Sequence, residues 1–400
     1  MPLPDTINPD SLPSPGLRPS LKYLMAAGCG VVVANIYYCQ PLLGAFARDF
    51  RVSESKASLI NILTQAGYGL GLFFIVPLGD KLQRRRMIVA MHLLAAMALA
   101  AAALSRNIGS LAAASLIIGI ATTACQVFIP LAAHLARDEE RGKVIGAMMG
   151  GLLAGILVSR TLSGLVAQYL GWRMVYITAT AMMLIMAWLM FRMLPAETPA
   201  FTGTYRQLMG SLWVLLKQQP VVQQSAIIGA ALFGAISAFW ATMAFFLGAV
   251  PYHYSLSVIG LFGLIGAGGA LASPLIGRFI DRGNPMVAIR SGTIMIMVGF
   301  VDLWLGRFSV FFVIGGVILL DLGMQSAHIP NMARNYALIP SARTRLNTLY
   351  MTSFFIGGTL GSTLGSMAWD SFGWAGVCAA GMGMALLGMG AALVPFRKSK

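Results

Sequence analysis

Apolar residues form long runs along most of the chain, and short polar stretches carrying the charges separate them. A helix needs roughly 20 apolar residues to cross the hydrocarbon core of a bilayer. The runs are of this length, so the pattern predicts about twelve transmembrane helices. They are expected near residues 22–46, 57–79, 87–105, 110–134, 143–169, 172–194, 221–248, 256–279, 286–305, 309–334, 345–368 and 374–396.

The composition supports this reading: 58% of the 400 residues are hydrophobic and only 10% are charged. A soluble domain of this length could not cover itself with so few charges, whereas lipid solvates the outside of a membrane protein. The net charge of +15 does not indicate nucleic acid, because the basic residues form short clusters between apolar runs. The four cysteines lie inside apolar runs without metal-ligand spacing, so no cofactor or metal is expected.

The basic residues indicate how the helices are oriented. With loops assigned alternately from an inside N-terminus, 21 of the 28 Lys and Arg fall on the inner side and six on the outer side. Cytoplasmic loops carry an excess of Lys and Arg. Both termini are therefore expected in the cytoplasm, which requires an even number of spans.

Similar residues recur at an offset of about 200, which indicates two repeated halves. Ile129 and Pro130 match Ile329 and Pro330, Gly171 and Trp172 match Gly373 and Trp374, and Asp80 matches Asp281. We therefore expect an all-α membrane protein with two pseudo-symmetric six-helix halves, as alternating access requires. The divisions are a disordered cytoplasmic tail 1–20, a half 21–194, a cytoplasmic linker 195–220 containing an amphipathic helix, a half 221–396 and a tail 397–400.

Three stretches carry a resemblance to a known family: PLGDKLQRRR at 77–86, ANIYYCQPLL at 34–43 and AGILVSRTLSGLVAQYLGWR at 154–173. The whole chain resembles the major facilitator superfamily, and within it a bacterial drug:proton antiporter-like branch. The resemblance implies a bacterial inner-membrane transporter, multi-pass and without enzyme activity. The chain departs from the family pattern at three places, which are Gln83, Ser115 and the pair Ser159-Arg160.

Asp321 is the one acidic residue near the centre of a predicted span. An ionised and unpaired carboxylate there costs at least ~2.5 kcal/mol. It should therefore face a cavity, pair with a cation or hold a proton. Asp321 is either the proton-coupling residue or a structural acid held by neighbouring helices.

Helical spacing places Asp321, Gln325, His328 and Asn335 on one stripe of span ten. Pro330 should locally break the backbone hydrogen-bond ladder of this span. A polar stripe needs water or partners, so it should face the central cavity or another helix. His328 could relay protons, since histidine titrates near neutral pH. Alternatively, it hydrogen-bonds across the bundle.

Arg160 is the one basic residue deep inside a span, and its counterpart in the other half is Ser362. It could bind an anionic group of the substrate or pair with Asp321 between the halves. A static contact to backbone carbonyls, or an extension toward the membrane surface, is the alternative.

Other polar and aromatic residues share faces within the spans. Such surfaces suit partly apolar organic ligands, but they also join helices to one another. In span one Asn35 and Tyr38 share a face while Gln40 and Pro41 point elsewhere. The remaining stripes are Asn61, Gln65 and Tyr68 in span two, Gln126 ahead of Pro130 in span four, and Phe233, Ser237 and Trp240 in span seven.

Asp80, Arg84 and Arg85 form a cluster after span two, and Asp281 repeats the acid after span eight. The resemblance implies a conformational latch there, whereas a hydrated run of loop charges is the alternative.

The function expected from these features is proton-coupled efflux of a small organic molecule by a monomer in the lipid bilayer. A symporter or facilitator that imports a nutrient is the alternative. A channel or membrane enzyme has least support, because no nucleophile motif, metal cluster or nucleotide loop is present.

Overall fold

The computed structural model describes residues 17–137, 140–195, 204–266, 284–339 and 343–394, and most of them are helical. Within this part of the chain, ten helices are long and apolar enough to span a membrane, and one of them joins two spans at Gly373. A shorter apolar helix, Leu256–Gly266, begins where span eight is predicted. The rest of that span lies outside the described residues, as does Asp281. The expected all-helical membrane fold is confirmed.

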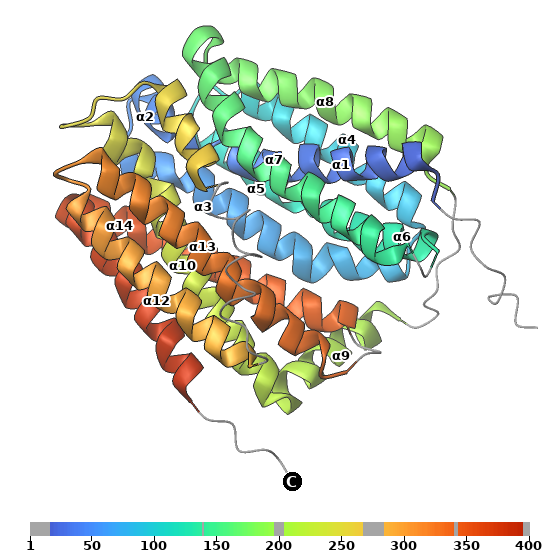
Figure 1. The fold of residues 1–400 in the computed structure, drawn as a ribbon. Helices are drawn as coiled ribbons and strands as arrows, with labels where there is room; N and C mark the ends of the chain where they lie inside the picture. The colour runs from blue at the N-terminus through green and yellow to red at the C-terminus, as the bar shows by residue number, and fades with distance from the viewer. Residues whose placement is uncertain (1–16, 138–139, 196–203, 267–283, 340–342, 395–400) are drawn as a thin grey trace, which may run out of the picture.

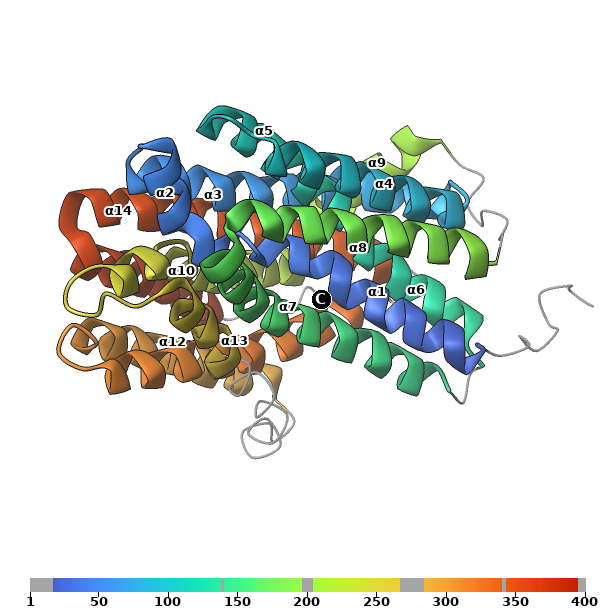
Figure 2. The same ribbon diagram turned by 90° about the horizontal axis from the view of Figure 1, so that it is seen from above.

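The helices form two groups, which lie one above the other in Figure 1. The first contains α1 (Pro19–Tyr37), η2 (Gln40–Leu42), α2 (Leu43–Phe50), α3 (Glu54–Leu70), η3 (Gly71–Ile75), η4 (Val76–Asp80), α4 (Arg84–Ala103), α5 (Ile108–Thr122), α6 (Cys125–Leu135), α7 (Arg141–Leu170) and α8 (Trp172–Met193). The second contains α10 (Pro220–Gly248), the 256–266 helix, α12 (Pro285–Leu305), α13 (Val310–Tyr336) and α14 (Arg343–Leu393), with α9 (Tyr205–Gln218) before it. Figure 2 shows the same helices from above.

We name the two ends of the bundle after elements that lie there in Figure 1. The α2 end carries α2 and the turns at Gly171 and Gly373, and the α9 end carries α9 and the start of α1. Both glycines have a positive φ, of 85° and 60°, which a residue without a side chain adopts at little cost. Each precedes a tryptophan, so the same sharp turn joins consecutive spans in both halves.

Close packing through glycine is also repeated in the two halves. In the first half, a β-carbon at Gly155 of α7 would lie 2.2 Å from the carbonyl oxygen of Gly30 in α1. In the second half, a β-carbon at Gly361 of α14 would lie 1.9 Å from the carbonyl oxygen of Gly234 in α10. Small residues allow such close approach of helices in lipid. The first and fifth spans of each half therefore pack backbone to backbone.

Several predicted spans are interrupted rather than continuous. Span one stops at Tyr37, and η2, which contains Pro41, follows it. Span two passes through the π-helical η3 into the 3₁₀ helix η4, which contains Pro77. Proline lacks a backbone N–H and clashes with the preceding turn, so a regular helix does not continue through it without distortion. These breaks reorient the side chains that follow.

The amphipathic helix expected between the halves is present as α9. A capping box between Thr204 and Gln207 satisfies its first backbone N–H groups. Its apolar face contributes Leu212 to a small cluster with Val222, Leu346 and Leu349. α9 therefore packs against the second half at its own end of the bundle.

Candidate functional site

Arg160 carries its charge into the interior of the bundle and is only 6% exposed. Its Nε donates a hydrogen bond to Gln40 Oε1 at 2.6 Å. The ring centroids of Tyr37 and Trp240 lie 4.6 and 4.0 Å from its Cζ. Aromatic faces attract a guanidinium, and more strongly where water is excluded. Nη1 reaches Ile156 O at 3.4 Å, and Nη2 has no acceptor within the described part of the chain.

The break in span one directs Gln40 toward Arg160. A continuous helix would have turned Gln40 away from the polar face of span one, as the spacing suggested. Because α1 ends at Tyr37 and the chain resumes in η2, that extrapolation fails for this residue. A Gln-Pro pair inside an apolar run was the signal that could have identified it.

A chain of hydrogen bonds continues from Gln40 into the second half. Gln40 Nε2 donates to Asn61 Oδ1 at 3.5 Å, and Asn61 Nδ2 donates to Ser362 Oγ at 3.1 Å. Gln65 Nε2 donates to the same Ser362 oxygen at 3.2 Å. The Ser362 hydroxyl lies 3.4 Å from Ser237 O on α10, to which it donates. Thus the predicted stripe of span two meets α14 and α10, and Ser362 is a participant that its sequence context did not single out.

Asp321 lies close to Arg160 but does not pair with it directly. The two residues do not form an ion pair within 4.0 Å, although both are described. Both contact the 256–266 helix: a β-carbon at Gly266 would lie 2.0 Å from Asp321 Oδ2, and one at Gly263 would lie 2.7 Å from the Arg160 Cβ. Trp240 reaches the Gly266 position as well, with Cζ2 at 3.5 Å. The acid, the cation and the indole therefore meet on one turn of this helix.

The polar stripe of span ten divides into two environments. Asp321, Gln325 and His328 are half-buried, whereas Asn335 is fully buried and its side-chain amide has no hydrogen-bond partner. His328 Nδ1 lies 2.9 Å from the hydroxyl of Tyr350 on α14. This contact corresponds to the hydrogen-bonding alternative for His328, while a role in proton relay stays a prediction.

The remaining predicted cavity residues make contacts inside the first half. Asn35 Nδ2 lies 3.4 Å from Met183 Sδ on α8, and Asn35 Oδ1 is buried without a partner. Gln126 Nε2 donates to Tyr68 OH at 3.0 Å. Tyr38 is buried just after the end of α1. The structure thus places these residues away from the hydrogen bonds of Arg160.

The predicted latch residues contact neighbouring backbone. Arg84 Nε donates to Gly79 O at 3.2 Å, and Arg85 donates to Phe191 O at the end of α8. The Cζ of Arg85 also lies 4.8 Å from the Phe191 ring centroid. Asp80 ends η4 at this turn. Because Asp281 is outside the described residues, the acidic partner in the second half stays a prediction.

Further hydrogen bonds join the halves between Arg160 and the α2 end. They are Thr161 Oγ1 to Gly260 O at 3.1 Å, Leu256 N to Gln168 Oε1 at 3.2 Å, and Trp369 Nε1 to a carboxylate oxygen of Glu54. A β-carbon at Gly164 would lie 2.4 Å from Leu256 O, so the backbones are also in close contact. The halves are closed against each other at this end.

In the described part of the chain, no three His, Cys, Asp or Glu side chains gather where they could hold a metal ion. The site instead offers a buried guanidinium, amide and hydroxyl hydrogen bonds, and a half-buried carboxylate. These groups lie where the two halves meet, so a ligand bound there would contact both halves.

Comparisons with known proteins agree with this architecture. The model of the Major Facilitator Superfamily matches residues 25–333. The uncharacterized transporter YgaY of Escherichia coli O157:H7 is 42% identical over 94% of this chain and 96% of its own length. The relative described as "Probable transporter SCO4007" of Streptomyces coelicolor is 31% identical over 93% of this chain and 86% of its own length.

A similar solved structure is a bacterial homologue of the human lysosomal transporter Spinster, in an inward-facing and occupied conformation. Its TM-score is 0.72 at 13% identity, and the match covers 94% of this chain and 95% of that one. These matches define a polytopic membrane transporter. The chain belongs to the Major Facilitator Superfamily, a class of transporters rather than of enzymes.

Proposed function

We propose that this transporter exports a small organic molecule across the bacterial inner membrane in exchange for protons. Its halves would alternate access to a site between them, with the α9 end in the cytoplasm. The excess of basic residues in the loops assigned to the inner side supports this orientation. The resemblance to drug:proton antiporter-like proteins supports the direction of transport.

The observation that carries the proposal is the environment of Asp321. Its carboxylate is half-buried, and no hydrogen bond joins it to another described residue. It lies against the 256–266 helix on the same turn as the Arg160 side chain. A carboxylate without fixed donors can take up and release a proton as its access to water changes. Movement of the 256–266 helix relative to α7 would change that access.

Proton-coupled import is the second candidate. The position of Arg160 favours it if the substrate is an anion. If the substrate is an anion held by Arg160, its charge would repel an ionised Asp321 nearby. The anion would then bind better with Asp321 protonated, and the two would cross together. Direction of transport therefore needs a direct test.

The test uses everted vesicles from cells that overproduce the transporter, with the lumen acidified. A growth-inhibition screen on the same cells supplies the compound. An exporter should accumulate that compound inside the vesicles, and adding it should dissipate the pH gradient. A symporter should instead accumulate it in right-side-out vesicles with acid outside.

Asp321→Asn should abolish the coupled accumulation, because an amide cannot carry the proton. The matched control is Asp302→Asn, which changes a half-buried acid on α12. It should leave the accumulation near the level of the unmodified protein. Undiminished coupling in Asp321→Asn would refute its role as the proton site.

A further inference from the structure

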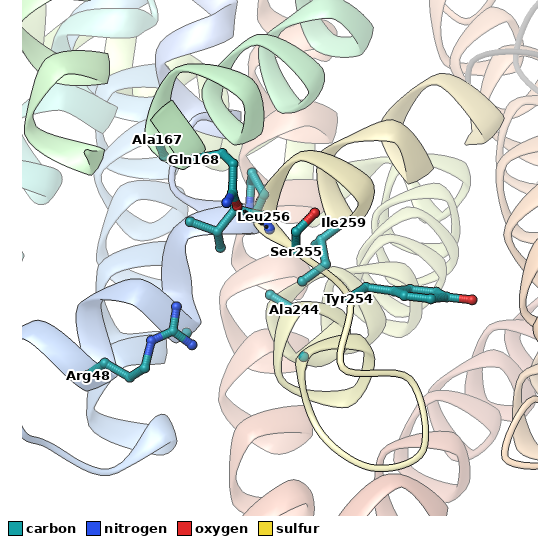
Figure 3. A pocket seen from close by; sticks show the side chains of 11 residues that line it. Arg48, Ala167, Gln168, Ala244, Tyr254, Ser255, Leu256 and Ile259 are labelled. Atoms are coloured by element: carbon teal, nitrogen blue, oxygen red, sulfur yellow. Dashed lines mark hydrogen bonds between the residues drawn. The ribbon is translucent and has the colours of Figure 1, made fainter. Parts of the chain in front are cut away.

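A pocket of about 310 Å³ lies between the two halves at the α2 end. Figure 3 shows it from close by, with the side chains of the 256–266 helix facing those of the first half. Both halves contribute to its lining: Arg48 and Gln168 come from the first half, and Ala244, Ser255, Leu256 and Ile259 from the second.

The pocket lies on the same elements that hold Arg160, nearer to the α2 end. Ala244 follows Trp240 by one turn of α10, and Ala167 follows Arg160 by two turns of α7. Ile259 precedes Gly260, whose carbonyl accepts the hydroxyl of Thr161. The pocket and the buried guanidinium are thus separated by the contacts that close the two halves.

The charge of the pocket is positive. Arg48 is the one charged residue among its eleven lining residues, and Figure 3 shows its guanidinium extended toward the second half. The neighbouring acid Asp49 is already engaged, by Arg173 at 2.8 Å and by Trp172 at 3.0 Å. The Arg48 guanidinium itself has no hydrogen-bond partner in the described part of the chain. Its charge is therefore available to a ligand.

The rest of the lining suits a small organic body with one polar group. Ala244, Leu256 and Ile259 supply apolar walls. Gln168 uses its Oε1 to accept from Leu256 N, which leaves its amide hydrogens for a ligand. Ser255 adds an exposed hydroxyl at the rim.

Further from the α2 end than the pocket, the guanidinium of Arg160 has one edge left for an anion. The Nε of Arg160 donates to Gln40, and the rings of Tyr37 and Trp240 lie near its Cζ. The Nη2 hydrogens are free of acceptors in the described residues. One N–H of Nη1 and one of Nη2 run parallel at the end of a guanidinium, and such a pair matches the two oxygens of a carboxylate.

We infer that the α2-end pocket is the outer binding vestibule of the substrate route, and that it holds organic anions on their way between Arg160 and the outside. The claim that substrate passes through the pocket rests on the proposed transport function. The charge selectivity of the pocket does not depend on it. Arg48 attracts the anionic group, and the apolar wall accepts the body of the molecule.

The test places one cysteine in the pocket of the purified protein, by Ser255→Cys. The four native cysteines are all buried, so the new thiol can be followed by itself. Its reaction rate is measured with an anionic and a cationic methanethiosulfonate of similar size, carrying sulfonate or trimethylammonium. The ratio of the two rates reports the charge that a small organic ion meets in the pocket.

Arg48→Gln in this background should lower the anionic-to-cationic rate ratio about fivefold, since one unit charge close to the thiol is removed. The matched control is Arg51→Gln, at the end of the same helix but outside the lining. It should change the ratio less than twofold. Equal effects of the two substitutions would show a general surface potential and overturn the vestibule.

A second measurement separates this inference from the proposed function. In right-side-out vesicles, the sulfonate adduct at Ser255→Cys should block transport of the screened compound, whereas the unreacted variant transports it. If transport is absent altogether while the rate ratio still depends on Arg48, the pocket selects anions and the transport proposal fails. If transport proceeds with the adduct in place, the pocket is not on the route.

Discussion

Arg160 and Ser362 occupy equivalent places in the two repeated halves, in the fifth span of each. The backbone around them follows the same pattern, because α7 packs on α1 and α14 packs on α10 through close glycine contacts. Their chemistry differs: one is a buried cation and the other a buried hydroxyl. Gln40 and Asn61 connect them by hydrogen bonds. Symmetric packing thus supports an asymmetric polar site.

The comparison suggests a division of labour between the halves. The first half holds the charge, and the guanidinium lies against Tyr37 of the same half and Trp240 of the second half. The second half supplies Ser362, which gathers hydrogen bonds from Asn61 and Gln65. In the proposed alternating access, separation of the halves at the α2 end would break these bonds. The cost of breaking them would set part of the balance between the two access states.

The largest effect on transport is expected when Arg160, the charged one of the two equivalent residues, is replaced. Arg160→Met keeps much of the volume but leaves Gln40 Oε1 without its donor, at a cost of about 1–3 kcal/mol. Transport should fall by about 100-fold if the charge also serves the substrate, and Arg160→Lys, which lacks the planar fork, should lose about tenfold. Initial rates in vesicles, normalised to the amount of folded protein, check this. Wild-type rates in Arg160→Met would contradict it.

The next effect concerns the helix on which Arg160 and Asp321 meet. Gly266→Ala introduces a β-carbon 2.0 Å from Asp321 Oδ2, so the acid or the helix must shift. Overpacking of this kind costs about 1–3 kcal/mol. We expect a lower Tm in detergent and a loss of pH-driven transport.

The control for that substitution is Gly146→Ala in α7. A β-carbon there meets nothing within 4 Å. Alanine is also a better helix former than glycine by up to about 1 kcal/mol. The Tm should stay the same or rise, so a drop equal to that of Gly266→Ala would point to a general intolerance of alanine.

A smaller effect is expected at the uncharged member of the pair. Ser362→Ala removes the acceptor shared by Asn61 and Gln65, which weakens the closed α2 end by about 1–2 kcal/mol. A cysteine at Ser255 should then react with a neutral thiol reagent several-fold faster, because the α2 end opens more often. The control Ser353→Ala removes a hydroxyl that bonds within its own helix, to Leu349 O at 2.9 Å, and should not change the rate.

The smallest effect is the coupling between the two equivalent positions. Arg160→Lys and Ser362→Ala are combined, and the free energies from the transport rates are compared with the sum of the single changes. Because hydrogen bonds connect the two residues, we expect a coupling of about 0.5–1 kcal/mol. The same cycle with Ser353→Ala should be additive within about 0.5 kcal/mol. Additivity in both cycles would show that the polar chain does not transmit energy.

Much of the fold was predictable because lipid imposes simple rules on sequence. Backbone groups in hydrocarbon must be satisfied within a helix, so long apolar runs can be assigned as spans. The intramembrane positions of Arg160 and Asp321 were identifiable for the same reason, since a charge inside a span is costly and stands out. The resemblance to the superfamily, carried by three short stretches, is confirmed by the family match over residues 25–333.

The contacts of the site were less predictable. The hydrogen bond between Arg160 and Gln40 joins residues 120 positions apart, and that between Asn61 and Ser362 joins residues 301 apart. Helical spacing relates neighbours within one helix, and it carries no information about which helices meet. Spacing also fails at a break, as the turn before Gln40 shows.

The sequence by itself determined the membrane-spanning helices, the repeat of two halves and the two intramembrane charges, because each of these follows from the cost of polar groups in lipid. Only the tertiary structure decided that Arg160 bonds to Gln40 rather than pairing with Asp321. It alone showed that Ser362 ends the chain of side-chain hydrogen bonds that starts at Arg160. It also showed that a pocket lined by Arg48 lies nearer to the α2 end than Arg160. Those features depend on how separate helices pack, and packing is a property of the whole bundle.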